Sequence, residues 1–173
     1  MKVTLTHDGK SVELDLTAEQ MTALGLKEEK KKTGYERVER GCSYWFYDAA
    51  ARIFKFTEFG AKSDSLLYNA ANYYTDENLA NANARADRLM WELRRFAAEN
   101  GGIPSVEDWN NTNLDKYEIS YEYDVKKLTP SSMHIIRSAG ITHFASKDAA
   151  VKAIEKFHDE LIWYFTEYEA MLR

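Results

Sequence analysis

One long stretch of helical periodicity limits the folds that this chain can adopt. Between residues 76 and 98, apolar side chains recur at intervals of three and four, which places them on one face of an α-helix. They are Leu79, Ala82, Ala86, Leu89, Met90, Leu93, Phe96 and Ala97. Thr75 or Asp76 supplies the start signal, and Gly101-Gly102 supplies the stop signal. A helix of this length needs other elements against which to bury its apolar face.

A second helical stripe occupies the C-terminal part of the chain. Ser146 is its expected N-cap. The apolar positions are Ala150, Ile154, Phe157, Leu161, Phe165 and Tyr168. Each helix follows short strand-like segments, which we expect at 35–38, 44–47, 52–56 and 72–74, and again at 117–124, 133–137 and 141–144. Residues 57–71 are ambiguous, with a helical turn at 66–68.

The fold class predicted from this order is α+β. Antiparallel strands and two long amphipathic helices form two loosely similar units, each with several strands followed by one helix, at residues 35–102 and 103–173. Tyr74-Thr75-Asp76 of the first unit lies opposite Phe144-Ala145-Ser146 of the second. This match indicates a degenerate duplication.

The start of the chain predicts a small separate element at residues 1–26. Asp8-Gly9 is a hairpin signal between two alternating strands. Thr17 and Gln20 then form the capping box of a short helix that ends at Gly25. Twenty-six residues are too few for an independent core, so this ββα element needs a surface on which to dock. Residues 27–34 are charged and read as an exposed linker.

Composition excludes several classes of protein. The net charge of -5 argues against a non-specific nucleic-acid binder, which normally needs a basic field. Cys42 is the single cysteine, so a scaffold of intrachain disulfides is excluded. No run of about 18 apolar residues predicts a membrane span, and the first residues lack the apolar core of a signal peptide. We therefore expect the protein to act in the cytoplasm, without membrane contact.

The sequence contains no recognisable catalytic or metal-binding motif. The four histidines do not have metal-ligand spacing, and the eight glycines form no phosphate-binding loop. We therefore expect no cofactor, no metal and no enzymatic activity. A small enzyme with a diffuse site, built from residues without a motif, is the alternative.

One strand of the second unit has an acidic face. Glu118, Glu122 and Asp124 alternate with tyrosine and isoleucine, and strand geometry separates alternate side chains by roughly 7 Å. That step is comparable with the spacing of phosphates along one nucleic-acid strand. The three carboxylates are therefore our candidate partner-binding residues, as a mimic of nucleic acid. The plainer interpretation is an ordinary solvated strand face.

The aromatic strand at 44–47 is a second candidate. Tyr44 and Trp45 are the anchors we would select for a partner, since exposed rings can also stack on bases. Several cations are available for phosphate contacts, namely Arg52, Lys55, Arg85, Arg88, Arg94 and Arg95. Packing in the core is the competing interpretation of these rings.

Three stretches together resemble a group of small accessory proteins of phages and mobile elements in gut bacteria. They are Gly34–Val38 with Tyr44–Tyr47, Leu93–Ala97, and Asp108–Asn110 with Asp159–Tyr168. The resemblance covers most of residues 33–168, and its motifs are structural. Phage accessory proteins of this size and acidity often bind and block a host defence component, and some inhibit CRISPR nucleases.

The leading functional hypothesis is therefore a non-enzymatic phage or mobile-element binding protein in a bacterial host cell. In its most concrete form it inhibits a host CRISPR effector nuclease by occluding a basic nucleic-acid groove. A nucleic-acid-binding accessory protein, using the aromatic strand and the arginine-bearing helix, is the first alternative. The small enzyme is the second.

Overall fold

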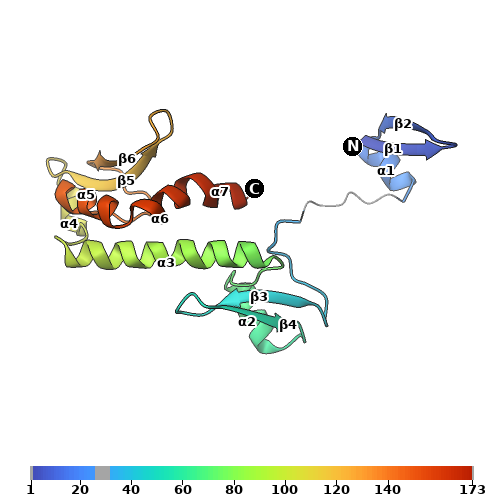
Figure 1. Ribbon diagram of the computed structural model, residues 1–173, viewed down its shortest axis with the longest axis horizontal. Coiled ribbons are helices and arrows are strands. Elements are labelled where there is room, and N and C mark those ends of the chain that lie inside the picture. Colours follow the sequence, from blue (N-terminus) through green and yellow to red (C-terminus); the bar gives the residue numbers. More distant parts are fainter. Residues whose placement is uncertain (1, 26–31, 173) are drawn as a thin grey trace. The chain divides into compact units, whose positions relative to one another are not determined.

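The computed structural model describes residues 2–25 and 32–172, which fall into two compact units, Met1–Lys32 and Thr33–Arg173 (Figure 1). Most of the predicted linker at 27–34 lies outside the described residues. The α+β class is confirmed, since the described residues contain helices together with three separate two-stranded antiparallel sheets.

The smaller unit has the predicted ββα order. Strands β1 (Lys2–His7) and β2 (Lys10–Asp15) pair antiparallel, and helix α1 (Ala18–Ala23) follows. The capping box is present, since the Thr17 N–H donates to Gln20 Oε1 at 2.9 Å and the Gln20 N–H donates to Thr17 Oγ1 at 3.3 Å. Every residue of β2 is exposed, including Val12 and Leu14.

The larger unit is organised around one long helix, α3 (Glu77–Glu99). Asp76 caps it by accepting from the Leu79 N–H at 2.8 Å. Against the N-terminal half of α3 lies a hairpin of β3 (Ser43–Tyr47) and β4 (Ile53–Thr57), accompanied by the short helix α2 (Lys62–Asn69) (Figure 1). Tyr47 ties this hairpin to α3, because its hydroxyl donates to Asp87 Oδ2 at 2.6 Å.

The C-terminal half of α3 carries the main core. Leu89, Leu93 and Phe96 pack with residues of a second hairpin, β5 (Lys116–Glu122) and β6 (Lys127–Met133), and of α5 (Lys147–Lys156). The short helix α4 (Val106–Asn110) precedes β5. After α5 the chain continues through α6 (His158–Trp163), a π-helical turn η1 (Tyr164–Tyr168) and α7 (Glu169–Met171).

The two hairpins are built on one repeated plan. In each hairpin, the first strand also pairs along its other edge, with the residue two positions before a helix N-cap. Trp45 and Tyr74 exchange backbone hydrogen bonds of 2.8 Å, and Tyr117 and Phe144 exchange bonds of 2.9 and 2.7 Å. Tyr74 and Phe144 therefore occupy equivalent positions in the two units, as the sequence predicted.

A glycine precedes each hairpin at a matching place. The Thr75 N–H donates to the Gly34 carbonyl at 2.8 Å, and the Ala145 N–H donates to the Gly102 carbonyl at 3.3 Å. Gly34 cannot be replaced freely, since its φ is +87° and an added Cβ would lie 2.5 Å from a methyl of Leu79. The matching glycines, bridges and caps mark two copies of a hairpin–helix unit.

Four predicted strands are wrong. Residues 35–38 form no strand, and residues 72–74 contribute only the bridge at Tyr74. Of residues 133–137 only Met133 lies in a strand, at the end of β6, and residues 141–144 contribute only the bridge at Phe144. The strand that pairs with β5 is β6. The β5–β6 turn has no glycine and places Lys126 at a φ of +52°, so it carries no hairpin signal. Pro130 also lies within β6, where an edge strand can accept it.

The second long helix is interrupted where one continuous helix was predicted. Phe157 ends α5 and precedes α6 with a φ of -112° and a ψ of 21°. At this break its ring packs edge-on against Phe96, with the centroids 5.7 Å apart. Periodicity of side chains persists across the break, so the pattern alone did not reveal it.

Candidate protein-interaction surface

The outer face of the β3–β4 hairpin exposes a cluster of phenylalanine rings. Alternation places Phe46, Phe54 and Phe56 on the face turned away from Trp45 and Tyr47. The Phe46 ring lies 5.5 Å from the Phe54 ring and 5.3 Å from the Phe56 ring, between centroids. Phe56 is 52% exposed. We call these three residues the phenylalanine surface.

Further apolar side chains are exposed on the same part of the unit. Phe59 follows β4, and Leu66 and Tyr68 lie on α2, all of them exposed. Scattered apolar residues are normal on a soluble protein, but connected rings of this size are typical of interaction sites.

Helix α2 covers only one end of this hairpin face, at Tyr44. The Tyr44 ring stacks on Tyr73 with centroids 3.9 Å apart, and its hydroxyl donates to Asp64 Oδ1 at 2.9 Å. Burial and this hydrogen bond raise the pKa of Tyr44. Asp64 also accepts from the N–H groups of Phe59 and Ala61, and the first of these chiefly lowers its pKa. This polar cluster fixes α2 and leaves the phenylalanine surface uncovered.

The cations that touch exposed rings here already have acidic partners. Arg37 lies 5.7 Å from the Tyr68 ring and donates to both oxygens of Glu58, at 3.0 and 3.1 Å. Arg52 lies 5.8 Å from the Phe54 ring and donates to Asp48 at 2.8 Å. These hydrogen bonds raise the arginine pKa values and lower those of Glu58 and Asp48.

The two predicted aromatic anchors lie elsewhere than on this surface. Tyr44 is 0% exposed, so it is a core residue and cannot touch a partner. Trp45 is half-buried on the opposite face, packed toward Tyr74, Leu79 and Ala80. The sequence signal, a run of four aromatic residues, did not distinguish the two faces. The alternating Phe54-Lys55-Phe56 of the outer strand would have been the better signal.

The three predicted carboxylates do not form one ladder. Glu118 is only 14% exposed and points to His143, with Oε2 and Nε2 3.5 Å apart. Glu122 is exposed at the end of β5. Asp124 lies beyond the strand, in the turn, and accepts from the Val125 N–H at 2.9 Å. Glu122 and Asp124 therefore lie on the surface, whereas Glu118 is largely buried.

A buried polar group that the sequence did not reveal surrounds Glu118. Lys116 is 0% exposed, and its Nζ donates to the carbonyls of Asn111 and His134 at 2.7 and 3.0 Å. His143 is 4% exposed, and the Trp109 ring meets it edge-on at 5.0 Å. Burial lowers the pKa of His143, against an opposing effect of Glu118. Polar side chains therefore cover this part of the outer face of the second hairpin.

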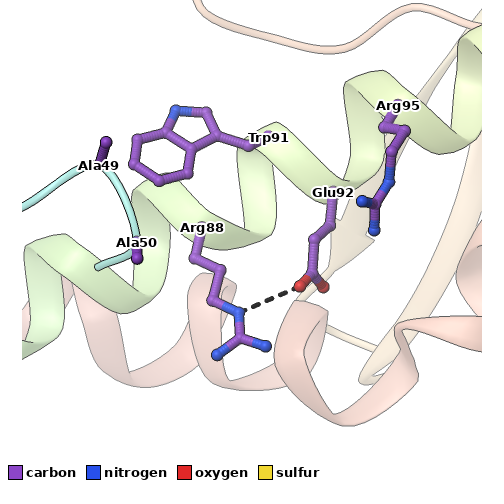
Figure 2. Close-up of a pocket in the computed structure, with 6 residues that line it drawn as sticks. All are labelled: Ala49, Ala50, Arg88, Trp91, Glu92 and Arg95. Atoms are coloured by element: carbon purple, nitrogen blue, oxygen red, sulfur yellow. Dashed lines mark hydrogen bonds and ion pairs between the residues drawn. The ribbon is translucent and has the colours of Figure 1, made fainter. Parts of the chain in front are cut away.

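The arginine-bearing helix of the alternative hypothesis has a shallow pocket of about 310 Å³. Figure 2 shows Trp91 of α3 beside the turn that carries Ala49 and Ala50, with Arg88 directed toward Glu92. The Arg88 Nε donates to Glu92 Oε1 at 3.0 Å. Arg95 lines the same pocket and is exposed, without an ion pair to any described residue. One ring and one unpaired cation provide little of the basic track that nucleic acid needs.

No family model, no curated protein and no solved structure matches this chain. Over residues 2–25 and 32–172, no group of three acidic, histidine or cysteine side chains is placed to hold a metal ion. None of the described helices is long and apolar enough to cross a membrane.

The β3–β4 hairpin offers exposed aromatic rings, charged side chains and backbone hydrogen-bonding groups. The nearby carboxylates of Glu58 and Asp64 are buried and committed to hydrogen bonds. Apolar surface of this kind favours contacts that remove it from water.

Proposed function

We propose that this chain is a non-enzymatic protein-binding module whose contact surface is the phenylalanine surface. The observation that carries the proposal is the cluster of mutually contacting rings that α2 leaves uncovered. Large aromatic side chains are favoured at the centres of protein interfaces, because each removes much apolar area from water with little loss of side-chain freedom.

A protein partner fits this surface better than a nucleic acid does. Single strands are bound by rings that alternate with free cations along the phosphate backbone. Here Arg37 and Arg52, the two cations that lie over exposed rings, are held by Glu58 and Asp48. Lys55, which pairs with no carboxylate of the described residues, lies on the opposite face of β4. The net charge of -5 acts in the same direction.

The resemblance to phage accessory proteins makes a host protein the partner to test first, including a CRISPR effector nuclease. The acidic route to such a partner, by mimicry of nucleic acid, now depends on Glu122 and Asp124, since Glu118 faces His143. The phenylalanine surface offers a route to a host protein that needs no acidic ladder.

Capture from a nuclease-treated bacterial lysate tests the proposal. The baits are the wild-type chain, Phe56→Asp and the matched control Ile136→Asp, which adds the same charge at an apolar residue that is 65% exposed. We expect one protein to bind the wild type and the control and to be lost with Phe56→Asp, while circular dichroism shows all three folded.

Two other results would redirect the assignment. A captured protein that is lost with Glu122→Lys and Asp124→Lys but kept with Phe56→Asp would support the acidic route. Binding that disappears on nuclease treatment would support the nucleic-acid alternative and contradict the proposal.

A further inference from the structure

The outer strand of the first hairpin has a free backbone edge. In an antiparallel pair, the backbone groups of alternate residues point toward the partner strand and away from it. Both backbone groups of Trp45 bond to Tyr74, so they point away from β4. Its register partner Lys55 must then point its own N–H and C=O away from β3.

The same alternation applies along the strand. The backbone groups of Tyr47 bond to the side chain of Asn72, again on the side away from β4. Ile53 and Thr57, which share the alternation of Lys55, therefore also direct their N–H and C=O groups outward. Within residues 2–25 and 32–172, no group is hydrogen-bonded to these outward donors and acceptors.

This edge is exposed to solvent. Phe54, Lys55 and Phe56 are consecutive exposed residues of β4, whereas β3 is half-buried or buried throughout. Helix α3 packs chiefly against β3, so space beyond β4 remains open. An exposed edge with apolar side chains is a template for pairing with another strand.

The second hairpin shows how such an edge is blocked. Trp45 and Tyr117 are equivalent, so Ile53, opposite Tyr47, corresponds to Pro130, opposite Ile119. Proline has no N–H, and it stands at a position whose N–H would point outward. The edge of β6 thus lacks a donor that the edge of β4 retains.

We propose that β4 binds an extended segment of a partner protein by strand addition, and that this segment carries an acidic residue between two apolar ones. This inference rests on the proposed function and names how the partner docks. The backbone of the segment pairs with Ile53, Lys55 and Thr57. Its two apolar side chains extend the phenylalanine surface, and its acidic side chain lies beside Lys55 on the opposite face.

Lys55 supports the acidic position. Its Nζ lies 5.0 Å from the Trp45 ring centroid, and no carboxylate of the described residues pairs with it. It also disfavours a second copy of this chain as the occupant. Antiparallel self-pairing that aligns Phe54 with Phe56 of the partner copy would set Lys55 against itself, and like charges directly opposite are destabilising.

A designed peptide serves as the probe. It is capped, has the sequence Ser-Thr-Val-Glu-Val-Thr-Ser and is titrated into the isotope-labelled full chain. We expect a Kd tighter than ~1 mM, with the largest amide shifts at Ile53, Lys55 and Thr57. Sedimentation of the free chain at the same concentration checks for self-association, and a dimer lost with Lys55→Pro would overturn the choice of occupant.

Charge exchange tests the acidic position without disturbing the core, since Lys55 is exposed. Lys55→Glu should weaken binding of the glutamate peptide by roughly fivefold, and a peptide with lysine in place of glutamate should recover it. Equal affinities for both peptides in both proteins would contradict the proposed partner chemistry.

Backbone methylation tests strand addition itself. Two peptides carry N-methyl groups on alternate residues, one set on the valines and the other on the threonines and glutamate. Strand addition requires one peptide to bind as the parent does and the other to lose binding. If Phe56→Asp abolishes binding while both methylated peptides bind equally, strand addition fails and the phenylalanine surface remains the contact. If no peptide shifts the amides of β4, strand addition is overturned, while the lysate experiment still decides the proposed function.

Discussion

Tyr44 and Lys116 occupy equivalent positions in the two hairpins, and both are fully buried. Each must recover the hydration that burial removes. Tyr44 does so with one hydrogen bond to a buried carboxylate, and Lys116 does so with two backbone carbonyls. Because the hairpin backbone tolerates either residue, the fold does not require a particular side chain here, and the outer faces have diverged.

The hydroxyl of Tyr44 should contribute measurably to stability. Tyr44→Phe keeps the stacked ring but leaves Asp64 with one hydrogen bond fewer inside the protein. We expect a loss of about 2 kcal/mol in the free energy of unfolding, since a bond to a charged group is involved. Urea denaturation measures it, with Tyr68→Phe as the control, since Tyr68 is exposed. Equal losses for both variants would contradict this account.

His143 should make stability depend on pH. Burial lowers its pKa, so the folded state favours the neutral imidazole. The contribution is complete above the unfolded pKa of about 6.5 and declines as pH falls toward the folded pKa, because the unfolded chain binds the proton first. Replacing the imidazole should therefore flatten the loss of stability below pH ~6.5.

The comparison that tests this uses His143→Gln and the exposed control His158→Gln. Thermal unfolding midpoints are measured across this pH range. A slope that changes in the control and not in His143→Gln would assign the pH dependence to a surface histidine.

At the scale of elements, the two copies of the hairpin–helix unit have equivalent caps. Asp76 accepts from the Leu79 N–H at 2.8 Å, and Ser146 accepts from the Ala149 N–H at 3.2 Å. Removing either cap leaves an unpaired N–H at a helix start. Asp76→Ala and Ser146→Ala should each lower the free energy of unfolding by about 1 kcal/mol.

Chemical denaturation measures the two cap variants, and Thr75→Ala serves as a control, since its side chain makes no capping bond. The loss with Asp76→Ala should shrink at high salt, because a carboxylate at a helix start also interacts with the helix dipole. An unchanged free energy with Ser146→Ala would show that the second cap does not stabilise its helix.

Sequence alone predicted the elements that carry a local signal. The caps of α3 and α5, the period of α3 and the Asp8-Gly9 hairpin all arise from contacts between near neighbours. Strand β6 was missed because its turn uses Lys126 at positive φ and its edge accepts Pro130. At the break, Phe157 packs against the ring of Phe96, more than 60 residues earlier in the chain, and no local pattern encodes this contact.

The candidate surface was only partly predictable for a related reason. The sequence indicated an aromatic β-hairpin but not which face is covered. Coverage is decided by Tyr73, by Asp64 of α2 and by Asp87 of α3. Likewise, the perfect alternation around Glu118 gave no sign that His143 would be brought against it from the loop before α5.

Within the larger unit, one helix serves both hairpins. Its N-terminal half supplies Leu79 and Ala80 to the first core cluster, and its C-terminal half supplies Leu89, Leu93 and Phe96 to the main one. Neither hairpin can form a core without α3, since two-stranded hairpins are marginal alone. We therefore infer that the two copies of the unit unfold together.

Leu93→Ala tests this coupling. Leu93 is buried in the main cluster, distant in sequence from both hairpins, and its truncation should cost about 2–5 kcal/mol. If α3 couples the copies, hydrogen exchange at Phe46 in β3 should lose as much protection as exchange at Ser120 in β5, although Phe46 does not belong to that cluster. Leu66→Ala, on an exposed position of α2, should change neither by more than about 0.5 kcal/mol. Loss of protection confined to β5 would mean that the second copy opens by itself, and the phenylalanine surface would then keep its shape independently of the main core.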